Sequence, residues 1–176
     1  MTMTSISEDL VIKLPDSTVI STVSHPWTRT LKALIEDFGF RYLERPKVLW
    51  IRGGNPDLFS MFLSLIESVG LYFGKTSDLP SLILQDEGRD GRLWLCEIGT
   101  WKCAVTEARK EALLNLVRIA DIPEGNVRFV TAFEGRESPA FLEFISTMAV
   151  DSMVWFRTEP DMLVTLQRST TRQGAV

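Results

Sequence analysis

The chain has 176 residues, a formal net charge of −4 and an apolar fraction of 45%. This length and apolar fraction are those of one ordinary globular domain with a sizeable core. The negative charge excludes a surface that binds nucleic acid through overall charge alone, but it is compatible with a local basic cleft. The two cysteines are too few for a metal cluster, and we expect a reduced, cytoplasmic protein.

The two ends of the chain differ from its middle. No segment approaches the length of a membrane span, and the N-terminus carries acids where a signal peptide is basic. We therefore expect no membrane partner. Residues 1–24 are rich in Ser and Thr around one apolar patch, which predicts a flexible arm or an edge strand. Residues 25–169 form the predicted domain, and residues 170–176 a polar tail.

The first part of the domain predicts two helices around one strand. His25-Pro26 marks a helix start, because proline is tolerated in the first helical turn, and Gly39 marks its end. Residues 47–51 are a short apolar run, typical of a buried strand. Apolar residues at helical spacing then predict a second helix over residues 55–70.

Residues 79–99 predict a β-hairpin, because two apolar runs flank a short segment rich in Gly and Asp. The second run ends in Glu97. A carboxylate at the end of a buried strand must be solvated, paired or used in chemistry. Pairing with Lys102 or Arg109 is the structural alternative to a functional role.

The rest of the chain alternates helices with strands. The predicted elements are a helix from Thr106 to near Pro123, a strand over 127–133, a helix from Ser138 to Met148, a strand over 153–156, a turn over 159–161 and a strand over 162–166. Strands flanked by helices predict an α/β fold around a mixed sheet, with the helix after the hairpin crossing over to a neighbouring strand.

Many metal-dependent nucleases place acids on two adjacent strands, with a lysine beside the second acid. The acids hold Mg²⁺, and the lysine helps to polarise the attacking water. From Lys47 to about Leu166 this chain resembles the BsuBI/PstI type of restriction endonuclease, a branch of the PD-(D/E)xK nucleases. The resemblance is carried in order by Lys47-Val48-Leu49-Trp50-Ile51, Leu79-Pro80, Leu93-Trp94-Leu95-Cys96-Glu97, Val130-Thr131-Ala132-Phe133, and Val154-Trp155 followed by Glu159-Pro160-Asp161.

This resemblance implies a restriction-endonuclease-like mixed sheet flanked by helices, and a role related to DNA cleavage in restriction or phage defence. Two positions depart from the family pattern. Ser81 stands where the family has a metal-binding Asp, and Gly99 stands where the Glu-x-Lys pattern has its lysine. A hydroxyl is a poor Mg²⁺ ligand beside a carboxylate, so the resemblance implies a degenerate site.

Several residues are candidates for a working or ancestral site. Glu97 matches the family's strand-end Glu and is the expected catalytic carboxylate and metal ligand, with Mg²⁺ as the cofactor if the site is active. Asp78 or Glu67 would supply the second acid, and Lys102 would assist the water. The candidate nucleic-acid contacts are Trp101, Lys102, Arg109 and Lys110.

Two functions remain open. The first is a weakly active or inactive nuclease-fold subunit, a pseudoenzyme that binds DNA or a protein partner in a defence complex. The second is an active Mg²⁺-dependent DNA endonuclease that uses Glu97 with a relocated second acid. Ser81, the absent Glu-x-Lys spacing and the acidic composition favour the first. Specific double-strand cutting usually needs a dimer, so a homodimer is a further expectation.

Overall fold

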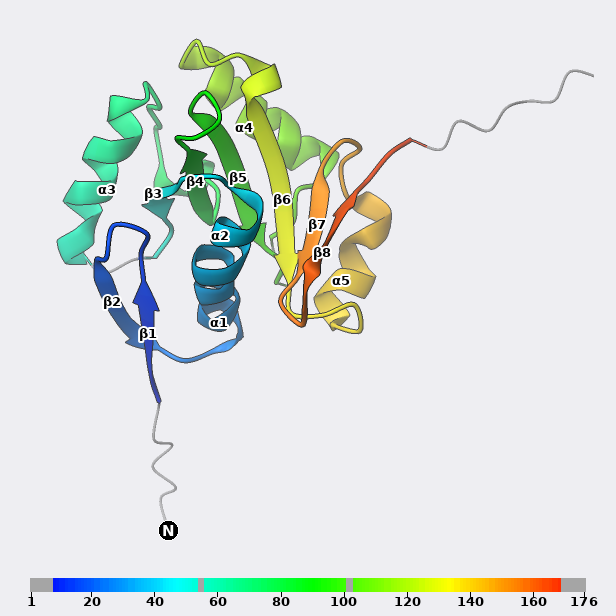
Figure 1. Ribbon diagram of the computed structural model, residues 1–176. Helices are drawn as coiled ribbons and strands as arrows, with labels where there is room; N and C mark the ends of the chain where they lie inside the picture. The colour runs from blue at the N-terminus through cyan, green and yellow to red at the C-terminus, as the bar shows by residue number, and fades with distance from the viewer. Residues whose placement is uncertain (1–7, 54–55, 101–102, 169–176) are drawn as a thin grey trace, which may run out of the picture.

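The computed structural model describes residues 8–53, 56–100 and 103–168. A six-stranded mixed sheet with the order β3-β4-β5-β6-β7-β8 is the centre of the fold (Figure 1). Its strands are β3 (Pro46–Ile51), β4 (Leu82–Asp86), β5 (Arg92–Ile98), β6 (Val127–Phe133), β7 (Met153–Phe156) and β8 (Glu159–Thr165). Strands β5, β6 and β7 are parallel, and the outer pairings are antiparallel. The predicted α/β fold and hairpin are confirmed.

Helices cover both faces of this sheet (Figure 1). On one face, α1 (Pro26–Ala33), a π-helical segment (Leu34–Phe38) and α2 (Gly39–Tyr42) form one continuous helix. On the other face lie α4 (Glu107–Ile119) and α5 (Pro139–Phe144), while α3 (Pro56–Ser68) packs beside β3. None of the helices in the described ranges is long and apolar enough to cross a bilayer.

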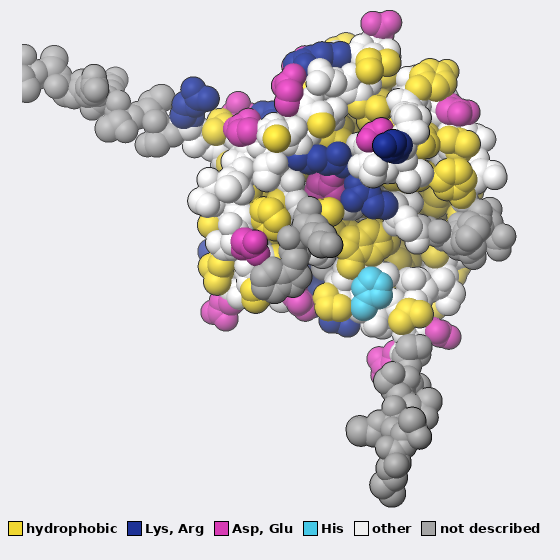
Figure 2. Space-filling view, turned by 180° about the vertical axis from the view of Figure 1, so that it is seen from behind, with side chains coloured by type: hydrophobic (Ala, Val, Ile, Leu, Met, Phe, Trp, Pro, Cys, Tyr) yellow, Lys and Arg dark blue, Asp and Glu magenta, His cyan; other side chains and the backbone are white. Residues whose placement is uncertain are grey.

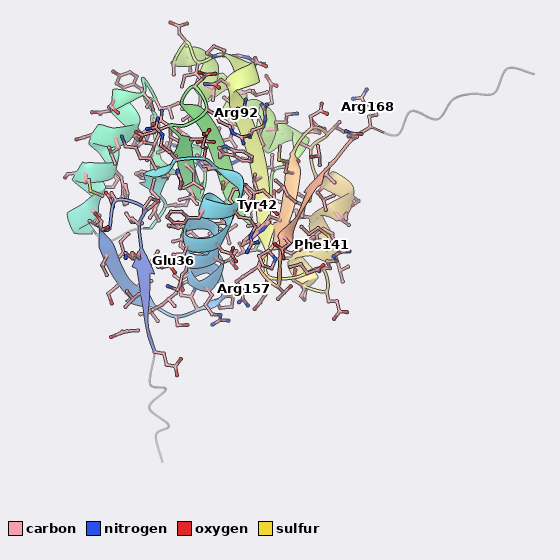
Figure 3. The ribbon with its side chains drawn as sticks, viewed as in Figure 1. Glu36, Tyr42, Arg92, Phe141, Arg157 and Arg168 are labelled. Carbon is pink, nitrogen blue, oxygen red and sulfur yellow. The ribbon has the colours of Figure 1, made fainter. Side chains whose placement is uncertain are left out.

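The first helix continues past Gly39, so its predicted end is wrong. Gly39 has a φ of −55°, an ordinary helical value, and its position uses none of the freedom of glycine. The helix continues because its next turn is packed: the rings of Phe38 and Tyr42 are 5.0 Å apart. The Tyr42 hydroxyl also donates a 2.9 Å hydrogen bond to the carbonyl of Pro160 in β8 (Figure 3).

The N-terminal segment forms a hairpin of its own. Strands β1 (Asp9–Lys13) and β2 (Val19–Val23) pair antiparallel, separately from the main sheet. One side of this hairpin is buried in the main core through Ile12 and Ile20. Glu36 joins the helix to the hairpin (Figure 3), because its carboxylate accepts a 2.7 Å hydrogen bond from the backbone N–H of Lys13. Described residues before 25 therefore pack on the domain, and residues 1–7 lie outside the described range.

Strand β8 starts at Glu159, so the predicted turn over residues 159–161 is wrong. Proline usually interrupts a strand because it lacks the N–H that a sheet needs. Pro160 is tolerated because β8 is an edge strand, where one side of the backbone has no neighbour.

Candidate functional site

The hairpin of β4 and β5 brings Ser81 and Glu97 together at one end of the sheet. Leu82 pairs with Cys96, so the residue before β4 lies beside the next-to-last residue of β5. Both side chains are buried, with Ser81 0% and Glu97 1% exposed. A carboxylate so buried requires close polar partners.

The first partner of Glu97 is Ser81. Its hydroxyl donates a 2.6 Å hydrogen bond to Oε2 of Glu97, and its backbone N–H donates to the same oxygen at 3.1 Å. The hydroxyl in turn accepts a 3.2 Å hydrogen bond from the N–H of Ile98. Oε2 of Glu97 is therefore held between β4 and β5.

The second partner is Arg109, in the first turn of α4. Thr106 caps this helix, its Oγ accepting a 3.2 Å hydrogen bond from the N–H of Arg109. Both Nε and Nη2 of Arg109 lie 2.8 Å from Oε1 of Glu97. The same guanidinium also donates to the carbonyls of Asp78 and Leu79, at 3.3 and 2.9 Å. The pairing alternative with Arg109 is confirmed.

A third partner, Arg52, was missed in the sequence. Arg52 follows β3 directly, and its N–H donates a 2.9 Å hydrogen bond to the carbonyl of Ser81. Its Nη2 lies 3.8 Å from Oε1 of Glu97 and contacts the carbonyl of Leu79. In the sequence, the feature that could have pointed to Arg52 is its place as a cation immediately after the apolar run over residues 47–51.

A cleft of about 300 Å³ opens above these groups. Figure 2 shows the face that contains it, where basic side chains gather around an acidic one near the centre. The cleft is lined by Arg52, Ser77, Glu97, Cys103, Ala104, Thr106, Arg109 and Phe144. Two guanidinium groups face one carboxylate, so the cleft is locally positive although the chain is acidic.

These residues do not fit Mg²⁺. This ion takes oxygen ligands in octahedral geometry and is usually held by one or two carboxylates. Both oxygens of Glu97 are hydrogen-bonded inside the protein, and the guanidinium of Arg109 lies where a cation would bind. Within residues 8–53, 56–100 and 103–168, no three His, Cys, Asp or Glu side chains gather to hold a metal. The donor set favours a salt bridge over a metal centre.

The other predicted acids are directed elsewhere. Asp78 accepts a 3.0 Å hydrogen bond from the N–H of Lys75 and so caps a short 3₁₀ turn. Glu67 is exposed in the last turn of α3. Gly70, just beyond it, packs towards Ala120, which follows the end of α4 opposite the cleft. The carboxylate of Asp78 is thus engaged in its own turn, and Glu67 lies near the end of α4 opposite the cleft.

Of the remaining predicted nucleic-acid contacts, Lys110 lies in the described part of the chain, and two others do not. Lys110 donates a 2.6 Å hydrogen bond to the carbonyl of Val150, and its ammonium lies 5.9 Å from the centre of the Phe129 ring. Trp101 and Lys102 lie outside the described residues. Their predicted roles therefore stay predictions.

The ring of Phe133 lies against Gly99, the position where the family pattern has its lysine. A Cβ atom on Gly99 would overlap Cδ1 and Cε1 of Phe133 and lie 2.9 Å from its Cζ. Phe133 is fully buried in a second small core cluster, so its ring has little room to move. Any side chain at position 99 requires Phe133 to shift.

The comparisons with known proteins identify the family of the chain. The model of the BsuBI/PstI restriction endonuclease domain matches residues 10–169. The chain belongs to this family. The BsuBI/PstI match includes the β1–β2 hairpin, and it confirms the resemblance drawn from the sequence. No match was found among the curated proteins.

A solved structure supports the same assignment. The chain is similar to the structure of SdaI restriction endonuclease, with a TM-score of 0.74 and 26% sequence identity. The match covers 95% of this chain and 50% of that one, so the chain spans half the length of that protein. The restriction-endonuclease fold is therefore confirmed, and this BsuBI/PstI domain is nuclease-like.

Proposed function

We propose that this chain is a nuclease-fold protein that binds DNA and does not cleave it through a metal ion. The observation that carries the proposal is the internal pairing of Glu97. Its carboxylate is neutralised by Arg109 and hydrogen-bonded to Ser81. A carboxylate with both oxygens engaged in this way has little affinity left for a hard cation.

Two further departures from the family pattern support the absence of cleavage. Ser81 removes one of the two carboxylates of the family pattern, which weakens a site for a hard cation. Gly99 removes the lysine, and Phe133 occupies the space that a lysine stem would need. Loss of one element could be compensated by a neighbour, but here the second acid and the lysine are both absent from their family positions.

Binding to DNA is supported by the family and by local charge. The matched family is a restriction endonuclease domain, and the matched structure is that of SdaI restriction endonuclease. The cleft at Glu97 carries two arginines against one acid. Phosphate contacts by arginine supply most of the sequence-independent affinity for DNA. A positive cleft on an acidic chain focuses this attraction at one place.

Two measurements on the purified protein test the proposal. Supercoiled plasmid DNA is incubated with Mg²⁺ or Mn²⁺ and either wild-type protein or Glu97→Gln, and nicking is followed on gels. Binding of a labelled duplex is measured by fluorescence anisotropy in EDTA and in Mg²⁺. We expect no nicking, and no gain in duplex affinity from the metal, which can only compete for the phosphates.

Each contrary result points to a specific alternative. Metal-dependent nicking that is lost in Glu97→Gln would overturn the proposal in favour of an active endonuclease with a relocated acid. A folded wild-type protein that binds no duplex would overturn the DNA-binding part and favour a protein-binding subunit. Circular dichroism checks that the variant is folded, since the substitution removes the charge that the half-buried Arg52 and Arg109 face.

A further inference from the structure

The two arginines beside Glu97 differ in how fully the protein uses them. Arg109 makes two 2.8 Å contacts to Glu97 and donates to two backbone carbonyls. Nη2 of Arg52 donates to the carbonyl of Leu79 and lies 3.8 Å from Glu97, whereas its Nη1 has only a 3.7 Å contact to the Sγ of Cys103, a weak acceptor. The Arg52 side chain is 28% exposed. Arg52 therefore retains donor capacity for a ligand, whereas Arg109 is committed to the fold.

Arg52 also lies where two hollows meet. It lines the 300 Å³ cleft above Glu97 and a larger hollow of about 560 Å³, here called the hairpin groove. The hairpin groove is lined by Ile12, Ile20, Ser21, Thr22, His25, Trp27, Thr28, Leu31, Ile51, Arg52 and Gly53. A third hollow of about 430 Å³ shares His25 and Trp27 with this groove. The three hollows are therefore neighbours, with Arg52 between the first two and His25 and Trp27 between the last two.

The space-filling view agrees with this arrangement. Figure 2 shows the single histidine of the chain, His25, on the same face as the central basic side chains, with apolar side chains between them. None of the described residues that line the hairpin groove is acidic. In the third hollow, Glu134 is paired with Arg157 at 2.7 Å. The lining of the hairpin groove thus presents Arg52 with no carboxylate beside it.

We infer that Arg52 binds a phosphodiester group of DNA whose backbone lies in the hairpin groove. The inference rests on the proposed function and specifies which residue holds the backbone. A guanidinium fork matches two phosphate oxygens, which makes arginine the better phosphate partner than lysine where geometry is fixed. The Ser21 and Thr22 edge of β2 and the Trp27 ring offer a polar and an aromatic wall for the adjoining sugar.

A salt titration of duplex binding tests this inference. The variants are Arg52→Met, which keeps an apolar stem without the charge, and Arg52→Lys, which keeps the charge without the fork. Arg118→Met is the matched control, because Arg118 lies on α4 but pairs with Glu111 and Glu124 at the surface. Arg52→Met should weaken binding about tenfold and make the plot of log K against log salt shallower by about one. Arg52→Lys should keep the wild-type slope with lower affinity.

A second measurement on the wild-type protein does not depend on the folding of any variant. Phenylglyoxal modifies accessible arginines, and mass spectrometry of the peptides reports each site. Bound duplex should protect Arg52 and leave Arg118 reactive. Wild-type protein that binds duplex with Arg52 unprotected, or a folded Arg52→Met with the wild-type slope, would overturn the inference and leave the proposed function intact. Wild-type protein that binds no duplex would overturn both.

Discussion

Ser81 donates its hydroxyl hydrogen to Glu97 over 2.6 Å, at the position where the family pattern has a second carboxylate. Two carboxylates at this distance in a buried site would repel each other unless a cation lay between them. The serine removes one charge, and Arg109 neutralises the other. The charges at the open end of the β4–β5 hairpin are thus balanced without a metal ion. The proposed function rests on this balance.

Removing the guanidinium of Arg109 should destabilise the fold strongly. Breaking a buried ion pair leaves an uncompensated charge, and the expected loss in the free energy of unfolding for Arg109→Met is about 3–5 kcal/mol. Urea denaturation measures this loss. The control Arg118→Met removes a surface cation from the same helix and should cost at most about 1 kcal/mol. Equal losses in the two variants would contradict a structural role for the Glu97 pair.

Restoring the family acid alone should not restore a metal site. In Ser81→Asp, the new carboxylate would share the guanidinium of Arg109, so Mn²⁺ should not raise the melting temperature. In the double variant Ser81→Asp with Arg109→Met, two adjacent carboxylates lose their cation, and Mn²⁺ should raise it by several degrees. Differential scanning calorimetry with and without millimolar Mn²⁺ measures both. A Mn²⁺ effect of equal size in the single variant would show that Arg109 does not exclude the ion.

The close approach of Gly99 and Phe133 makes a third prediction. Gly99→Ala forces the buried ring to move and should cost about 1–3 kcal/mol of unfolding free energy. Phe133→Val removes Cδ1 and Cε1, the two overlapping atoms, so the double variant should lose less than the sum of the two single changes. Gly125→Ala is the control, because a Cβ there meets no atom within 4 Å. Additive losses in urea denaturation would argue against the overlap.

The candidate site could be predicted in part because its strongest signals are local. The apolar run before Glu97 and the position of Arg109 early in α4 are both visible in the sequence. The sequence did not associate Arg52 with Glu97 or Phe133 with Gly99, because sheet pairing of distant segments brings each of them there. The end of the first helix was misjudged at Gly39, since packing against β8 outweighs the local preference of glycine.

Asp86, at the opposite end of β4, makes stability depend on acid pH. Burial tends to raise the pKa of its carboxyl, but backbone N–H groups of Arg45, Glu44 and Gly88 and the charge of Arg89 outweigh it, and the pKa is lowered. A lowered pKa stabilises the fold above the unfolded value of about 3.9, and this contribution is lost as pH falls through the folded pKa.

The consequence is a pH-dependent difference between wild type and Asp86→Asn. The variant should be less stable at pH 7, because the amide lacks the charge that these donors stabilise, and its nitrogen would replace the oxygen that accepts from the N–H of Glu44 at 3.2 Å and lies 3.8 Å from Arg89. The gap should narrow below about pH 4, where the wild-type carboxyl loses its advantage. Urea denaturation between pH 7 and pH 3 measures it. A gap that is independent of pH would show that the charge of Asp86 does not contribute.

In the proposed function, Glu97 is paired with Arg109 and Ser81 in place of a metal ion. Crystals of the wild-type protein soaked in Mn²⁺ test it most directly, because the anomalous signal of manganese locates the ion. We expect no anomalous peak at Glu97 and the guanidinium of Arg109 in contact with its carboxylate. A peak within coordination distance of Glu97, with Arg109 displaced, would contradict it.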